Sequence, residues 1–353
     1  MQPELGIIEG FYGKPWSWEA RAETVSFLAP YGYRFYMYAP KFDQYLRRRW
    51  QEPHPDALAA RLRTLASHCR DLGVRFGVGL TPFELYDLDD RTRSVLAEKL
   101  QLIDELGVDD LGVLFDDMRG DVPDLAKKQI AIVEWVRANT RATRIIVCPS
   151  YYSDDPVLDR VFGDRPENYL EDLGAGLGED VEIFWTGEEV ISRQFSPGHL
   201  ERVAGQLGRK PFIWDNYPVN DGQRMSQYLH IRGFTGRPSS NADLVAAHGI
   251  NPALQPTLNR IPAITLSDSY RQRERYEYAE SFRRACLEVL GDELGTMVRQ
   301  DLLNLQDIGV DRLGDKEKLL RERYAGVEHQ GAREIIEWLD GAYRITDEIV
   351  QTG

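Results

Sequence analysis

The sequence predicts a (β/α)8 TIM barrel over residues 1–264, followed by a small α-helical region over residues 265–353. From residue 6 to about residue 260, short apolar runs alternate with polar segments of helical character. The runs are almost continuously apolar, which is typical of parallel strands buried on both faces. Seven or eight such units in this length favour a closed barrel over an open doubly wound sheet.

Seven runs rich in β-branched and aromatic residues are the expected strands, and an eighth, weaker run completes the set. They lie at residues 6–11, 35–40, 75–80, 111–115, 145–149, 181–185, 211–214 and 244–250. No GxGxxG motif follows the first run, so a dinucleotide-binding fold has no support.

The segments between the runs carry the spacing of amphipathic helices. Residues 55–72 place leucines on one helical face, and Gly73 follows as a natural helix stop. Residues 91–106 show the same pattern, closed by Gly107. Beyond residue 265 the strand rhythm ends, and charged amphipathic segments at 267–290, 294–306, 315–324 and 332–350 predict helices.

Composition limits the classes of partner. The 353 residues include 43 Lys and Arg against 57 Asp and Glu, a formal charge of −14. Such a charge repels phosphate backbones, so nucleic acid is not an expected partner. No apolar run approaches the ~20 residues of a membrane span, so no membrane partner is expected. The first five residues lack the features of a signal peptide, which favours a cytoplasmic protein.

The sequence contains no motif typical of metal or cofactor binding. The three cysteines are far apart without a CxxC, and the six histidines lack ligand spacing. We therefore expect no metal and no organic cofactor.

Polar and aromatic residues follow nearly every expected strand. Because the carboxyl ends of barrel strands meet at one mouth, these residues should converge there. Carboxylates and amides pair with sugar hydroxyls, and Trp and Tyr rings stack on the apolar faces of sugars. The pattern therefore indicates a carbohydrate site.

The strongest single signal is the adjacent pair Asp116-Asp117 after the fourth run. Two neighbouring carboxyls in a sheltered pocket repel each other, which raises one pKa and allows one group to act as an acid. The alternative is that the pair only caps the following helix. Lys41 could likewise bind a substrate oxygen or pair with Asp43, and Trp185 and Trp214 could be sugar platforms or core residues.

Five motifs in order give the sequence a family resemblance. They are GIIEGFYGKPW at residues 6–16, YAPK at 38–41, LFDD at 114–117, WTG at 185–187 and WDN at 214–216. Together they resemble the catalytic domain of the family-84 glycoside hydrolases, the O-GlcNAcase or β-N-acetylglucosaminidase family. The resemblance spans about residues 6–260.

This resemblance implies substrate-assisted catalysis, in which the 2-acetamido oxygen of the substrate attacks the anomeric carbon and forms an oxazoline. Asp116 would orient the acetamido N–H, and Asp117 would serve as general acid and then general base. The substrate contacts carried over from the family motif are Gly10, Lys41, Tyr152, Trp214, Asn216, Asp221 and Asn259. The implied substrate is a GlcNAc-containing glycan or glycoprotein.

Two other readings stay open. The domain could bind GlcNAc without catalysis, although a lectin would bind its sugar little better for having two carboxylates removed from water. A retaining hydrolase with a protein nucleophile is the other reading, with Asp215 or Asp221 as the nearby candidates. The projecting helical region also makes a homodimer a possibility.

Overall fold

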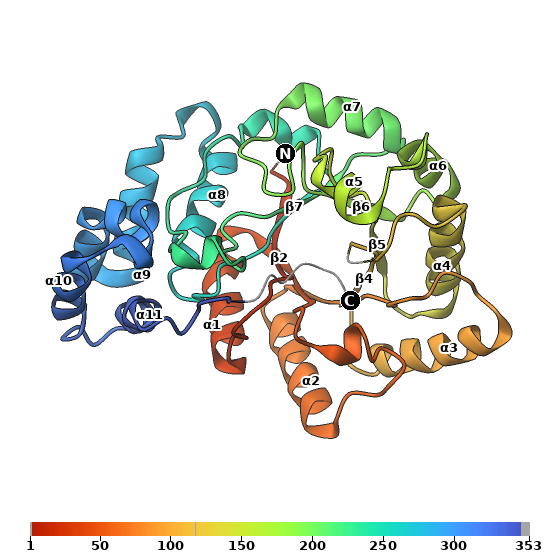
Figure 1. Ribbon diagram of the computed structural model, residues 1–353, viewed down its shortest axis with the longest axis horizontal. Helices are drawn as coiled ribbons and strands as arrows, with labels where there is room; N and C mark the ends of the chain where they lie inside the picture. The colour runs from red at the N-terminus through yellow and green to blue at the C-terminus, as the bar shows by residue number, and fades with distance from the viewer. Residues whose placement is uncertain (1, 117, 347–353) are drawn as a thin grey trace.

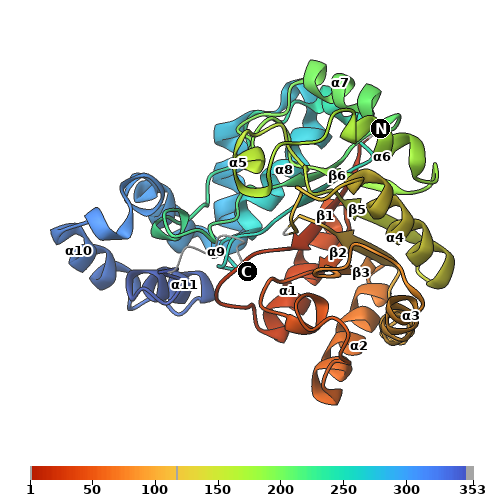
Figure 2. The same cartoon turned by 45° about the vertical axis from the view of Figure 1, so that its right-hand side comes forward.

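Eight parallel strands close into a barrel in chain order, which confirms the predicted fold class (Figures 1 and 2). The computed structural model describes residues 2–116 and 118–346. The strands are β1 (Glu4–Glu9), β2 (Tyr33–Tyr38), β3 (Arg75–Leu80), β4 (Asp110–Leu114), β5 (Arg144–Cys148), β6 (Glu182–Trp185), β7 (Phe212–Asp215) and β8 (Ala247–Ile250). β8 pairs with β1 in parallel, with Gly249 opposite Gly6, so the weak eighth run closes the barrel.

Helices between the strands, and one that follows β8, form the outer layer of the barrel. They are α1 (Trp18–Leu28), α2 (Asp56–Asp71), α3 (Asp90–Asp104), α4 (Leu125–Asn139), α5 (Val157–Phe162), α6 (Tyr169–Gly176), α7 (Pro197–Leu207) and α8 (Arg260–Gln272). The connection from β7 to β8 departs from the repeat, because its described residues 216–246 form only short 3-10 turns, η3 (Met225–Gln227) and η4 (Ser239–Asp243). This long connection supplies several residues to the barrel mouth.

The barrel interior is packed, so open space is confined to its ends. Gly6 and Gly249 make room for large neighbours, because a β-carbon on Gly6 would lie 2.2 Å from the Phe35 ring and one on Gly249 would lie 2.4 Å from Ile8. At the amino ends of the strands, Arg75 pairs with Glu4 at 2.9 Å and with Asp110 at 2.9 Å. This ionic cluster fills the end of the barrel opposite the expected site.

The helical region lies beside the barrel in both views and contains α9 (Tyr278–Gln300), α10 (Asp315–Tyr324) and α11 (Gln330–Leu339). The sequence predicts a break after residue 290, and α9 is kinked there at Gly291, which has a φ of 76°. α8 runs from 260 to 272 and so crosses the predicted boundary at 264/265, and the division into two domains stays a prediction. Residues 347–350 of the last predicted helix lie outside the described residues.

No described helix combines the length and the apolar character that a bilayer span requires.

Candidate active site

A cavity of about 210 Å3 opens at the carboxyl ends of the strands. All strands except β3 contribute residues from their last positions or the loops that follow them. The lining residues are Gly10, Tyr12, Lys41, Asp116, Cys148, Tyr152, Thr186, Val190, Ile191, Trp214, Asn216, Val219, Asp221, Gly222 and Asn251. The strand ends named by the sequence therefore meet at one mouth.

Asp116 and Lys41 form the charged centre of this cavity. The Lys41 ammonium donates to Asp116 Oδ2 at 2.5 Å, and both side chains are buried. Lys41 follows β2 and Asp116 follows β4, so the pair spans the gap above β3. Asp43, the alternative partner weighed for Lys41, accepts a hydrogen bond from the Tyr45 N–H at 3.0 Å and pairs with His54 at 3.2 Å. The ion pair fixes the carboxylate of Asp116 in one orientation at the cavity wall.

Asp117, the predicted general acid, lies outside the described residues.

Trp214, Asn216 and Asn251 form a hydrogen-bonded wall. The Trp214 indole N–H donates to Asn216 Oδ1 at 3.0 Å, and Asn251 Nδ2 donates to the same oxygen at 3.0 Å. Asn216 Nδ2 donates to the carbonyl of Val190 at 2.8 Å, and its second N–H has no acceptor among the described residues. The wall therefore offers an aromatic face beside an amide donor.

Gly10 is held close to this wall by packing and by a hydrogen bond. Its N–H donates to Asn251 Oδ1 at 3.2 Å, and a β-carbon at this position would lie 2.3 Å from the Trp214 ring. Only glycine fits here without displacing the indole. Close to Gly10 in the chain, the Tyr12 N–H donates to Asp221 Oδ2 at 2.8 Å and thereby ties the loop after β1 to the loop after β7.

The adjacent tyrosines after β5 have different positions. Tyr152 lines the cavity, whereas Tyr151 is buried and its hydroxyl donates to the carbonyl of Gly163 at 2.6 Å. Trp185 lies in the core, fully buried, with its indole N–H donated to His199 at 2.9 Å. Trp185 therefore belongs to the core rather than to a sugar platform.

Asn259 is the one described residue of the predicted site that does not line the cavity. It is fully buried at the start of α8, where its Oδ1 accepts the N–H of Ala253 at 3.1 Å. The asparagine that the structure brings to the mouth is Asn251, directly after β8. Its place after the eighth strand is the signal that could have identified it.

The Asp215 side chain lies in the protein interior and is bound there by other side chains. Its carboxylate is completely buried and is bound by Arg237 at 2.7 Å and by His248 at 3.0 Å. The ion pair with Arg237 and the hydrogen bond from His248 lower the pKa of Asp215 against the opposing effect of burial. Asp215 is not exposed to the cavity, which counts against its use as a nucleophile.

Among residues 2–116 and 118–346, no three His, Cys, Asp or Glu side chains are grouped so that they could hold a metal ion.

Comparisons with known proteins identify relatives over most of the chain. A family model described as beta-N-acetylglucosaminidase matches residues 5–306. The protein O-GlcNAcases of Mus musculus and Rattus norvegicus are each 27% identical over 276 residues, covering 75% of this chain and 30% of theirs. The chain thus spans less than a third of the length of these relatives. The structure of a mutant O-GlcNAc hydrolase from Thermobaculum terrenum superposes with a TM-score of 0.78 and 26% identity, covering 96% of this chain and 80% of the other.

Proposed function

Because the chain belongs to the beta-N-acetylglucosaminidase family of glycoside hydrolases, we propose that it removes terminal β-linked N-acetylglucosamine from glycans or glycoproteins. The reaction retains configuration and uses the substrate's acetamido group as the nucleophile. The observation that carries the proposal is the buried Lys41–Asp116 pair, which presents an oriented carboxylate to a cavity of a size suited to one sugar.

In the first half of the reaction, the acetamido carbonyl oxygen bonds to the anomeric carbon as the bond to the leaving oxygen breaks. Asp116 accepts a hydrogen bond from the acetamido N–H, which aligns the carbonyl oxygen and stabilises the charge of the oxazoline ring. Asp117 protonates the leaving oxygen. In the second half, water attacks the anomeric carbon and gives a proton to Asp117, and the acetamido group is released.

The remaining cavity residues position the sugar. The Trp214 ring, which lines the cavity and whose N–H is held by Asn216, packs against the apolar face of the sugar in this proposal. In this proposal the second N–H of Asn216 donates to a substrate oxygen, and the Asp221 carboxylate, which also lines the cavity, accepts from sugar hydroxyls. We assign Tyr152, which lines the cavity, to the anomeric end of the sugar, and Gly10 permits close approach of the backbone.

The test compares an aryl β-N-acetylglucosaminide with the matching β-glucoside. Turnover of the first alone is the expected result, since the glucoside has no acetamido group. Comparable turnover of both would favour a protein nucleophile, for which Asp221 is the remaining candidate at the mouth. Turnover of neither substrate would support a binding module.

Asp116→Asn and Asp117→Asn separate the two catalytic roles. Asp116→Asn should lower kcat by about 10²-fold or more on every substrate, because each turnover passes through the oxazoline. Asp117→Asn should lower kcat by about 10²- to 10⁴-fold on poor leaving groups and spare activated aryl sugars. The matched control is Asp121→Asn, the same change on the same loop in an exposed ion pair with Arg119. Equal losses on both kinds of leaving group would contradict the role of Asp117.

A further inference from the structure

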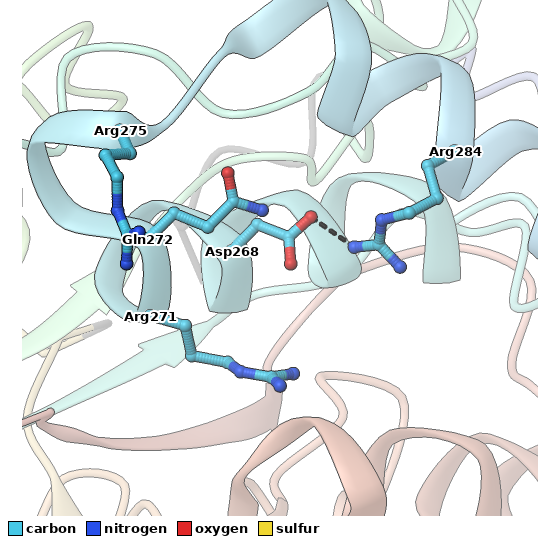
Figure 3. Close-up of a pocket in the computed structure, with 5 residues that line it drawn as sticks. All are labelled: Asp268, Arg271, Gln272, Arg275 and Arg284. Atoms are coloured by element: carbon cyan, nitrogen blue, oxygen red, sulfur yellow. Dashed lines mark hydrogen bonds and ion pairs between the residues drawn. The ribbon is translucent and has the colours of Figure 1, made fainter.

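A second cavity, of about 500 Å3, lies between α8 and α9, away from the sugar site (Figure 3). It is lined by Asp268, Arg271, Gln272, Arg275 and Arg284. α8 starts after the mouth loop and runs back along the barrel, where Ser267 donates to the carbonyl of Tyr31 in the turn before β2. The cavity is therefore at the amino-terminal end of the strands, opposite the sugar cavity.

Of the described residues that line this cavity, one is a carboxylate, and it is already bound by its own neighbours. Asp268 Oδ2 accepts the Ser281 hydroxyl at 2.6 Å and pairs with Arg284, and Asp268 is almost completely buried. Arg284 also pairs with Glu288 at 2.9 Å. Figure 3 shows the Arg284–Asp268 contact at one side of the cavity.

Arg271 and Arg275 are not neutralised in this way. Among residues 2–116 and 118–346, no carboxylate forms an ion pair with either guanidinium, and the Gln272 amide between them has no hydrogen-bond partner. Arg273 has a φ of 54°, a strained conformation for a residue with a β-carbon, and the chain reverses there between Arg271 and Arg275. The lining thus carries three guanidinium groups against one carboxylate on a chain whose net charge is −14.

Planar guanidinium groups bind oxyanions through paired N–H donors, and phosphate suits several of them at once. Arg271 and Arg275, the two guanidinium groups of the lining without a carboxylate partner among the described residues, together carry a charge of +2, which favours a dianion over a single carboxylate. We propose that the Arg271–Arg275–Arg284 cavity binds a phosphate monoester group, with the Gln272 amide as an additional donor. The ligand is either a small phosphate ester or a phosphorylated side chain of a peptide, which share this chemistry.

The test is calorimetric titration of the full chain with inorganic phosphate at constant ionic strength. The double variant Arg271→Gln/Arg275→Gln should bind phosphate at least about tenfold more weakly than the wild type, because two charged donor groups are lost. The matched control is Arg63→Gln/Arg91→Gln, which removes the same charge from two exposed arginines outside this cavity. This control should bind within about twofold of the wild type.

Three further measurements complete the test. Both double variants should hydrolyse an aryl β-N-acetylglucosaminide like the wild type, which shows that they are folded. A phosphoserine peptide that binds more tightly than inorganic phosphate, while its unphosphorylated form does not bind, assigns the site to a peptide. A phosphopeptide no tighter than phosphate assigns it to a small ester. Absence of saturable phosphate binding by the wild type, or equal binding by the Arg271→Gln/Arg275→Gln variant, would overturn the proposal.

Discussion

Glu334 of α11 should make the stability of the protein depend on pH. Its carboxyl is completely buried and accepts the N–H groups of Thr257 and Leu258, each at 2.9 Å, in the loop between β8 and α8. Burial raises the pKa of Glu334 from an ordinary 4.5 to about 7, against the smaller lowering effects of these two amides and of Arg260. The group joins the helical region to the loop that carries Asn251.

The pKa difference sets the size and sign of the effect. Below pH 4.5 Glu334 is protonated in the folded and unfolded chains, and its stabilising contribution is fully present. Between pH 4.5 and about 7 the folded state binds more protons than the unfolded state, so the free energy of unfolding falls as pH rises. At 1.36 kcal/mol per pKa unit, the loss amounts to about 3 kcal/mol and is complete above the folded pKa.

Glu334→Gln removes this titration while preserving an acceptor for the loop amides. Urea unfolding of wild type and variant from about pH 4 to about pH 8 measures the difference in their free energies of unfolding. That difference should shift by about 3 kcal/mol in favour of the variant as pH rises. Glu328→Gln, an exposed change just before the same helix, should leave the pH dependence as in the wild type. Parallel stability curves for wild type and Glu334→Gln would refute the reasoning.

Three other changes test the packing of the site. Gly10→Ala should raise KM for an aryl β-N-acetylglucosaminide by about tenfold or more, since the new methyl displaces the Trp214 ring. An unchanged KM would mean that the ring moves without cost. Arg237→Ala should lower the free energy of unfolding by about 3–5 kcal/mol, because Asp215 is left buried and without this partner, and urea unfolding with no loss would contradict that role. Asn251→Ala should lower kcat/KM by about tenfold to 100-fold through loss of its two hydrogen bonds, with a small change in Tm. A large fall in Tm would instead indicate a structural role.

The strands were predictable because burial on both faces leaves a continuous apolar run. The first two predicted runs extend to residues 11 and 40, whereas β1 ends at Glu9 and β2 at Tyr38. Apolar residues continue past the last paired residues of the two strands, Glu9 and Tyr38, since Phe11 and Ala39 remain buried at the barrel mouth. Hydrophobicity reports burial, and burial does not distinguish a strand from the loop that covers its end.

The candidate site was predictable where it depends on the strand ends alone. Polar residues directly after β4 and β7 had to converge, because all strands point to one mouth. The same rule applied to β8 identifies Asn251, whereas the family spacing pointed to Asn259 farther along the loop. That loop turns inward, and Asn259 is used to bind the N–H of Ala253.

The pairing of Lys41 with Asp116 could not be derived from the sequence. The partner nearest in sequence, Asp43, is two residues away, but its carboxylate is bound by the Tyr45 N–H at the start of the 3-10 turn η2 (Gln44–Leu46) and by His54. Asp116 follows a strand that is not adjacent to β2, so the contact depends on how closely the two loops approach above β3. The small residue Gly79 in β3 allows this approach, since a β-carbon on Gly79 would lie 2.6 Å from Ala39 and 2.7 Å from Leu114. The charged pair of the site is thus a consequence of barrel packing, which acts between strands and leaves no local pattern in the chain.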